Sequence, residues 1–164
     1  MTEGRAGGRL ATLLVKPERD PATAGKCVLI VEDNPLNMKL FSAVVEAQGY
    51  HVLQATNGSQ GLYLAHLEHP DLIMMDVQLP DMSGLEVTHS LKADNYTRDI
   101  PIIVTTAHWL RGDEEEIRAS GCDGFIAKPI AIAEFLELIE LFVTRGAAHR
   151  DTSTGQVESD RIRR

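Results

Sequence analysis

Five charged or polar side chains stand at the ends of short apolar runs in this chain. Glu32 and Asp33 follow the run 27–31, Asp76 ends the run 72–76, Thr106 ends the run 100–106, and Lys128 follows the run 125–127. Taken alone, each residue is ordinary, since an Asp can end a strand facing water and a Lys can be a solvated loop cation. Brought together, three carboxylates repel one another and require a cation. Hard oxygen ligands at that density favour Mg²⁺, and a phosphoryl group could then bind beside the metal.

The apolar runs predict strands, and helical patterns separate them. Four consecutive apolar residues before Asp76 are typical of a strand covered on both faces, as in a parallel sheet. Asn34 as N-cap with Pro35 behind it predicts a helix start, and Ser83 with Glu86 predicts a capping box. The expected strands are 27–31, 51–55, 72–76, 100–106 and 125–127, and the expected helices are 35–48, 59–67, 83–92, 111–120 and 131–143.

Strands that alternate with helices at this spacing form right-handed crossovers. The fold class is therefore α/β, a five-stranded parallel sheet with five helices on both faces. Because parallel strands end at the same edge, the five polar side chains should converge there, where open α/β sheets bind ligands. The acidic turn at Glu32 and Asp33 lacks the glycines of a dinucleotide or flavin phosphate site.

Specific segments resemble the receiver domains of two-component response regulators. These segments are Val-Glu-Asp-Asn at 31–34, Met-Asp-Val-Gln-Leu-Pro at 75–80, Met-Ser-Gly at 82–84, Thr-Ala at 106–107 and Lys-Pro at 128–129. The resemblance spans residues 27–143. The stretches 32–41, 46–50 and 84–88 are similar to single-domain receivers that act in cell-cycle and polarity control. The resemblance to receiver domains implies a flavodoxin-like sheet with strand order 2-1-3-4-5.

The resemblance also implies a role for each residue of the constellation. Asp76 is the expected phosphoacceptor, receiving its phosphoryl group from a histidine kinase or histidine phosphotransferase. The expected Mg²⁺ ligands are Asp33 and Asp76 directly, Glu32 through water, and the carbonyl of Gln78. Lys128, in a cis peptide bond with Pro129, would pair with a phosphoryl oxygen. Thr106 and Phe125 would form the switch that reports phosphorylation.

Net charge and hydropathy narrow the possible partners. The formal net charge is −8, but residues 27–143 hold 18 acidic and 6 basic residues, whereas each flanking segment holds 3 acidic and 5 basic ones. So acidic a surface repels nucleic acid, and we expect no binding to it.

The hydropathy of the chain and its cysteines indicate where the protein is located. The apolar run 10–15 is too short for a signal peptide and no run approaches the length of a membrane span, so no membrane insertion is expected. Cys27 and Cys122 fit no metal spacing, which favours reduced thiols in a cytoplasmic protein; the resemblance adds a polar position in the cell.

These observations divide the chain into three segments and leave three candidate functions to compare. We expect a flexible N-terminal arm at 1–25, a receiver domain at 26–143 and a disordered C-terminal tail at 144–164. The preferred function is a stand-alone response regulator, a monomer or weak dimer, that signals by phosphorylation-dependent binding to a sensor kinase or another protein. It would transfer the phosphoryl group to itself and lose it slowly, without being a turnover enzyme. A constitutive pseudo-receiver is the alternative; an aspartyl-phosphate hydrolase is disfavoured because Gln78 stands where its acid would be.

Overall fold

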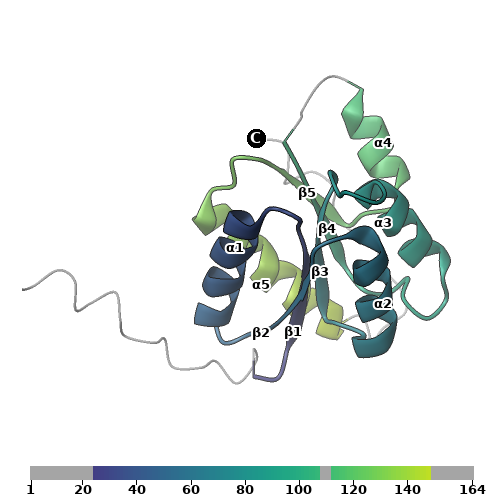
Figure 1. Cartoon of the computed structure of the whole chain (residues 1–164). Coiled ribbons are helices and arrows are strands. Elements are labelled where there is room, and N and C mark those ends of the chain that lie inside the picture. Colours follow the sequence, from purple (N-terminus) through teal and green to yellow (C-terminus); the bar gives the residue numbers. More distant parts are fainter. Residues whose placement is uncertain (1–23, 108–111, 149–164) are drawn as a thin grey trace, which may run out of the picture.

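The computed structural model describes residues 24–107 and 112–148, and these form strands and helices in strict alternation (Figure 1). In chain order the elements are β1 (Cys27–Val31), α1 (Pro35–Ala47), β2 (His51–Ala55), α2 (Gly58–Glu68), β3 (Leu72–Asp76), α3 (Gly84–Ala93), β4 (Ile102–Thr106), α4 (Asp113–Ala119), β5 (Gly124–Ala127) and α5 (Ile132–Ala148).

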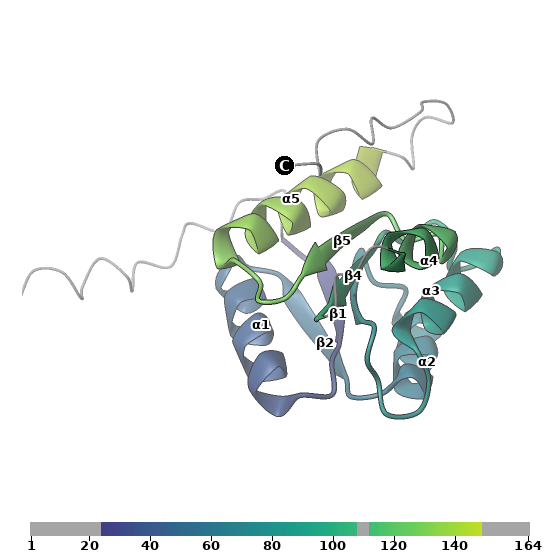
Figure 2. The ribbon, with the colours of Figure 1, turned by 90° about the horizontal axis from the view of Figure 1, so that it is seen from above.

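The strands form one parallel sheet in the order β2-β1-β3-β4-β5, which confirms the flavodoxin-like fold. Figure 2 shows α1 and α5 covering one face, while α2, α3 and α4 cover the other. β3 lies in the middle of the sheet, and all five of its residues are buried. The strand that ends on Asp76 is therefore held on both faces and by a strand on each side.

Each face of the sheet has its own apolar core. Phe41 of α1 and Phe135 of α5 pack together on one face, with ring centroids 5.4 Å apart, over Met74 of β3. On the other face Val87 and Leu91 of α3 cover residues of β3 and β4 that alternate with those of the first core. The two cores fix which side chains of each strand point to which face, because a shift in register by one residue would move buried apolar side chains to the opposite face of the sheet.

The predicted helix starts are confirmed at the level of hydrogen bonds. The Asn34 side chain accepts from the backbone N–H of Leu36 at 2.9 Å and of Asn37 at 3.1 Å, with Pro35 in the first turn of α1. Ser83 and Glu86 form the capping box of α3. Both helices thus begin immediately beside the loops that leave the carboxyl edge of the sheet.

The largest errors in the predicted boundaries are at the end of α5 and the start of β4, and several other boundaries differ by one residue. α5 continues to Ala148 beyond the predicted end at Val143, because extending an existing helix costs little and needs no further apolar face. β4 begins at Ile102 and not at residue 100, since Pro101 has no N–H for the ladder. α4 ends at Ala119, one residue early.

Parts of other predictions lie outside the described residues. They are Arg111 at the predicted start of the fourth helix, residues 1–23 of the predicted arm, and residues 149–164 of the predicted tail. Within 24–107 and 112–148, no helix combines the length and apolar character needed to cross a bilayer.

Candidate functional site

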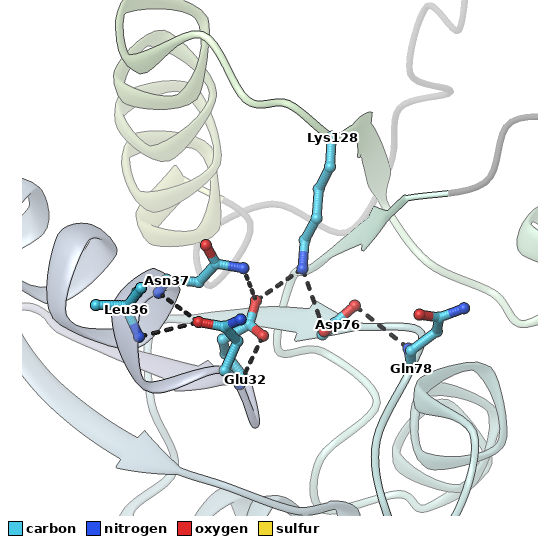
Figure 3. A network of polar contacts seen from close by, with 7 residues as sticks. Glu32, Leu36, Asn37, Asp76, Gln78 and Lys128 are labelled. Carbon is cyan, nitrogen blue, oxygen red and sulfur yellow. Dashed lines mark hydrogen bonds and ion pairs between the residues drawn. The ribbon is translucent and has the colours of Figure 1, made fainter.

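The predicted polar residues lie at the carboxyl edge of the sheet, and Figure 3 shows Glu32, Asp76, Gln78 and Lys128 among them. Asp76 is the last residue of β3 and Thr106 the last of β4, while Glu32 follows β1 and Lys128 follows β5. β1, β3, β4 and β5 pair side by side in this order, so their ends are neighbours. Residues from four separate segments thus reach one place, as their positions in the sequence predict.

Three carboxylates form the acidic part of the site. Glu32, Asp33 and Asp76 each offer an oxygen within 4.8 Å of the other two. Glu32 is 1% exposed and Asp76 is 4% exposed, whereas Asp33 is exposed at the mouth. A set of hard oxygen donors this close, two of them buried, fits the ligand preference of Mg²⁺.

Lys128 is the cation that faces this cluster. Its Nζ lies 2.8 Å from Oε2 of Glu32 and 3.2 Å from Oδ2 of Asp76 (Figure 3). Burial acts to lower the pKa of Lys128, but the hydrogen bonds and charges of Glu32 and Asp76 outweigh it, so the pKa is raised. The ammonium group therefore stays charged. The peptide bond between Lys128 and Pro129 is cis, as predicted.

The environment of Asp76 favours its protonated form more than water does. Burial raises the pKa of Asp76 from 3.8 to about 6, and the negative charge of Glu32 adds to the rise. The Lys128 ammonium and the backbone N–H of Gln78, which donates to Oδ1 at 3.3 Å, act in the opposite direction. The single charge of Lys128 does not balance the three carboxylates of this cluster, which favours the binding of a further cation.

The helix start beside the site holds Glu32 in place. Oε1 of Glu32 accepts from the backbone N–H of Asn34 at 3.1 Å, and Oε2 lies 3.5 Å from Nδ2 of Asn37 (Figure 3). Sequence reasoning missed Asn37, although a polar side chain in the first turn of the following helix is a usable signal. Together with the contact to Lys128, these bonds give both carboxylate oxygens of Glu32 a polar partner.

The loop from β3 to α3 is shaped by two residues whose roles the sequence did not reveal. A Cβ on Gly84 would clash with the carbonyl oxygen of Asp76, so only glycine allows this approach. Asp81 accepts hydrogen bonds from the N–H of Gly58 at 2.7 Å and of Ser59 at 2.9 Å, at the start of α2. These bonds hold the pKa of Asp81 at about 2. Gln78, a predicted ligand, lies in this loop and bridges to Ser83.

Thr106 and Phe125, the predicted switch residues, lie on the same face of neighbouring strands. Phe125 pairs in register with Val104, two residues before Thr106, and packs against the core that contains Val104. Thr106 is 5% exposed, and its carbonyl accepts from the N–H of Lys128 at 2.7 Å. The backbone of Thr106, the predicted switch threonine, is therefore hydrogen-bonded directly to the backbone of Lys128.

Comparisons with known proteins agree with this geometry. The model of the response regulator receiver domain family matches residues 28–140. The chain belongs to the response regulator receiver domain family. It is also 52% identical over 118 residues to proteins named polar-differentiation response regulator DivK from Brucella ovis and from Brucella anthropi, covering 72% of this chain and 96% of each relative.

Solved receiver domains have the same fold. A CheY-like receiver from Methanospirillum hungatei superimposes with a TM-score of 0.72 at 25% identity, covering 77% of this chain and 99% of that one. The receiver domain of sensor histidine kinase PA1611 from Pseudomonas aeruginosa superimposes with a TM-score of 0.68 at 34% identity, covering 73% and 98%. That structure has a magnesium ion coordinated in its active-site cleft. In the present receiver Glu32, Asp33 and Asp76 form a group of carboxylates that could hold a metal ion.

Proposed function

We propose that this receiver accepts one phosphoryl group on Asp76 from a histidine kinase or histidine phosphotransferase, in a Mg²⁺-dependent step, and that the phosphorylated form binds a protein partner. The observation that carries the proposal is the position of Asp76: a buried carboxylate, beside Glu32 and Asp33, with the Lys128 ammonium 3.2 Å away. This arrangement provides a nucleophile, metal ligands and a cation for the phosphoryl group.

The transfer requires no general base. A pKa of about 6 leaves the Asp76 carboxylate ionised at neutral pH, so one of its oxygens can attack the phosphorus directly. As the new P–O bond forms, the P–N bond of the phosphohistidine breaks and its electron pair returns to the imidazole. Lys128 then shifts from the carboxylates to a phosphoryl oxygen and stabilises its charge.

The metal would be held by residues that already surround Asp76. Asp33 and Asp76 would bind it directly, Glu32 through water, and the Gln78 carbonyl would complete the protein's share. A bound Mg²⁺ supplies charge neutralisation for the transferring oxygens. The position of Gln78 makes rapid turnover unfavourable, because a side-chain amide cannot transfer a proton to or from water attacking the acyl phosphate.

The proposal is tested by intact-protein mass spectrometry after incubation with acetyl phosphate and Mg²⁺. The wild type should gain one phosphoryl group and lose this gain when a chelator is present, while Asp76→Asn should gain none. Asp123→Asn is the matched control, because Asp123 is also a lysine-paired carboxylate at a strand end, but at the opposite edge of the sheet. Labelling of Asp76→Asn would move the acceptor elsewhere, and an unlabelled wild type would favour the pseudo-receiver.

The partner surface is proposed to be the face formed by α4, β5 and α5. Phe125 belongs to β5 and shares a sheet face with Thr106, so a movement of the Thr106 side chain towards the phosphoryl group would change the space available to the aromatic ring. The named role of the Brucella relatives in polar differentiation suggests a sensor kinase of cell-cycle or polarity control as the partner.

A charge reversal on each side of the molecule separates the possible interfaces. Arg118 of α4 is exposed and pairs with Glu114 at 2.7 Å, and Lys39 of α1 is an exposed cation on another surface. Arg118→Glu should weaken binding of the phosphorylated protein to the kinase that labels it, whereas Lys39→Glu should leave binding unchanged. The reverse result would place the interface on α1.

A further inference from the structure

Thr105 occupies a buried position beside Asp76 that the proposed chemistry does not use. It pairs in register with Asp76 of β3 on one side and with Ile126 of β5 on the other. Residues in register on parallel strands point to the same face of the sheet. Met74 and Ile103, two residues before Asp76 and Thr105, both lie in the core beneath α1 and α5, so the two polar side chains stand next to each other at the end of that core.

The Thr105 hydroxyl has no hydrogen-bond partner within residues 24–107 and 112–148. Thr105 is 0% exposed, and its Oγ1 is the one buried side-chain nitrogen or oxygen of these residues without a partner. Burying a hydroxyl unpaired destabilises a fold, and valine has the same shape without this cost. The preceding residues Ile102–Val104 are all β-branched and apolar, so valine would suit the strand equally well.

The position of Lys128 indicates which group the Thr105 hydroxyl could form a hydrogen bond with. Lys128 follows β5, yet its ammonium contacts Asp76 of β3 and Glu32 beyond β1, so the side chain passes the end of β4, which lies between β5 and β3. Thr105 and Thr106 are the last two residues of β4, and Thr105 is the one that shares the face of Asp76. The polar group nearest to it in the sheet register is the Asp76 carboxylate.

We propose that Thr105 is a positioning residue whose hydroxyl donates a hydrogen bond to the Asp76 carboxyl group when Lys128 leaves it for the incoming phosphoryl group. The inference rests on the proposed function, because it assumes that Asp76 is the acceptor. The β-branched side chain has few rotamers, so the donor is held ready at little entropic cost. The hydroxyl would then replace the lysine contact at the moment when Asp76 must keep its orientation.

The experiment compares Thr105→Val, which removes the hydroxyl at constant shape, with Thr105→Ser, which keeps it. The rate of Asp76 labelling is measured over a range of acetyl phosphate concentrations with Mg²⁺, and unfolding by urea is measured without phosphodonor. Thr97→Val is the matched control, because Thr97 is also 0% exposed but donates to the Leu91 carbonyl at 2.8 Å, away from the site.

Thr105→Val is expected to slow labelling at saturating donor by about tenfold, the size of one hydrogen bond to a charged group, with an unchanged half-saturating concentration. Its resistance to urea should equal or exceed that of the wild type. Thr105→Ser should label at close to the wild-type rate, and Thr97→Val should lose stability but keep the labelling rate.

Labelling of Thr105→Val at the wild-type rate would overturn the inference while leaving the function of Asp76 intact. Equal slowing in Thr105→Val and Thr105→Ser would also overturn it, because packing and not the hydroxyl would then be responsible. A loss of stability in Thr105→Val as large as that in Thr97→Val would show that the hydroxyl is bonded in the resting state, again against the inference. An unlabelled wild type would instead refute the proposed function itself.

Discussion

The two edges of the sheet both pair lysines with carboxylates, but they balance charge differently. At the amino edge, Lys92 contacts Asp123 at 2.7 Å and also donates to the carbonyl of Ile100 at 2.7 Å, while Asp123 accepts from the N–H of Ile102 at 2.8 Å. Lys26 and Asp71 form a second pair at 3.5 Å, and Asp71 accepts from the N–H of Cys27. Asp123 and Asp71 thus each contact a lysine and accept a hydrogen bond from a backbone N–H.

At the carboxyl edge, three carboxylates share one lysine. Lys128 contacts Glu32 and Asp76, and Asp33 adds a further negative charge within 4.8 Å of both acids. Fully ionised, these four groups carry two more negative charges than positive ones. Both lysine–carboxylate pairs of the amino edge are therefore balanced in charge, whereas the carboxylates described at the carboxyl edge keep a negative excess that would suit a further cation. The difference separates pairs that hold the fold from the groups to which we assign the chemistry.

The largest expected difference in labelling rate is between variants of Lys128 at the carboxyl edge and Lys92 at the amino edge. Lys128→Met should slow labelling of Asp76 by acetyl phosphate by at least ~10-fold, because the ammonium that faces the phosphoryl group is lost. Lys92→Met should leave the labelling rate unchanged but lower the free energy of unfolding by about 2 kcal/mol, since Asp123 loses its cation. Labelling and urea denaturation of both variants measure this. Slow labelling of a folded Lys92→Met variant would contradict the assignment of the chemistry to the carboxyl edge alone.

The charge excess also predicts a pH dependence in the presence of a chelator. Because the pKa of Asp76 is raised in the folded state from 3.8 to about 6, folding favours its protonated form, so this stability is present at low pH and is lost as the pH rises through that interval. The loss is on the order of 3 kcal/mol, because each pH unit between these two pKa values costs about 1.4 kcal/mol.

Urea denaturation between pH values of about 4 and 7 checks this expectation against a variant that cannot ionise at the same position. Asp76→Asn should lack this decline, so the difference in unfolding free energy between variant and wild type should grow with pH. Parallel curves for the two proteins would mean that Lys128 already compensates the cluster.

The smallest expected effect belongs to the second lysine pair of the amino edge. Lys26→Met should lower the free energy of unfolding by less than about 1 kcal/mol, because the 3.5 Å contact is partly solvated and Asp71 keeps its bond to the Cys27 N–H. Urea denaturation measures the loss, with Lys26→Arg as a control that keeps the charge. A loss above 2 kcal/mol would mean that this pair resembles the one between Lys92 and Asp123.

Much of the fold and the site could be predicted from local sequence. The caps at Asn34 and Ser83 act within three residues, so the helix starts beside the site depend on no distant contact. The apolar run before Asp76 predicts a buried parallel strand, and parallel strands necessarily end at one edge. For this reason the convergence of Glu32, Asp76 and Lys128 followed from their places at strand ends before any geometry was known.

Tertiary structure alone decided which of these groups touch and which long-range contacts support them. Lys128 and Glu32 are 96 residues apart, and their 2.8 Å contact depends on the strand order that places β4 and β3 between β5 and β1. Asp81 caps a helix that starts 23 residues earlier, and the unpaired Thr105 hydroxyl exists only because β3 and β5 enclose it. Local sequence determines periods and caps because those interactions span a few residues, whereas the packing of the sheet determines which distant side chains share a buried space.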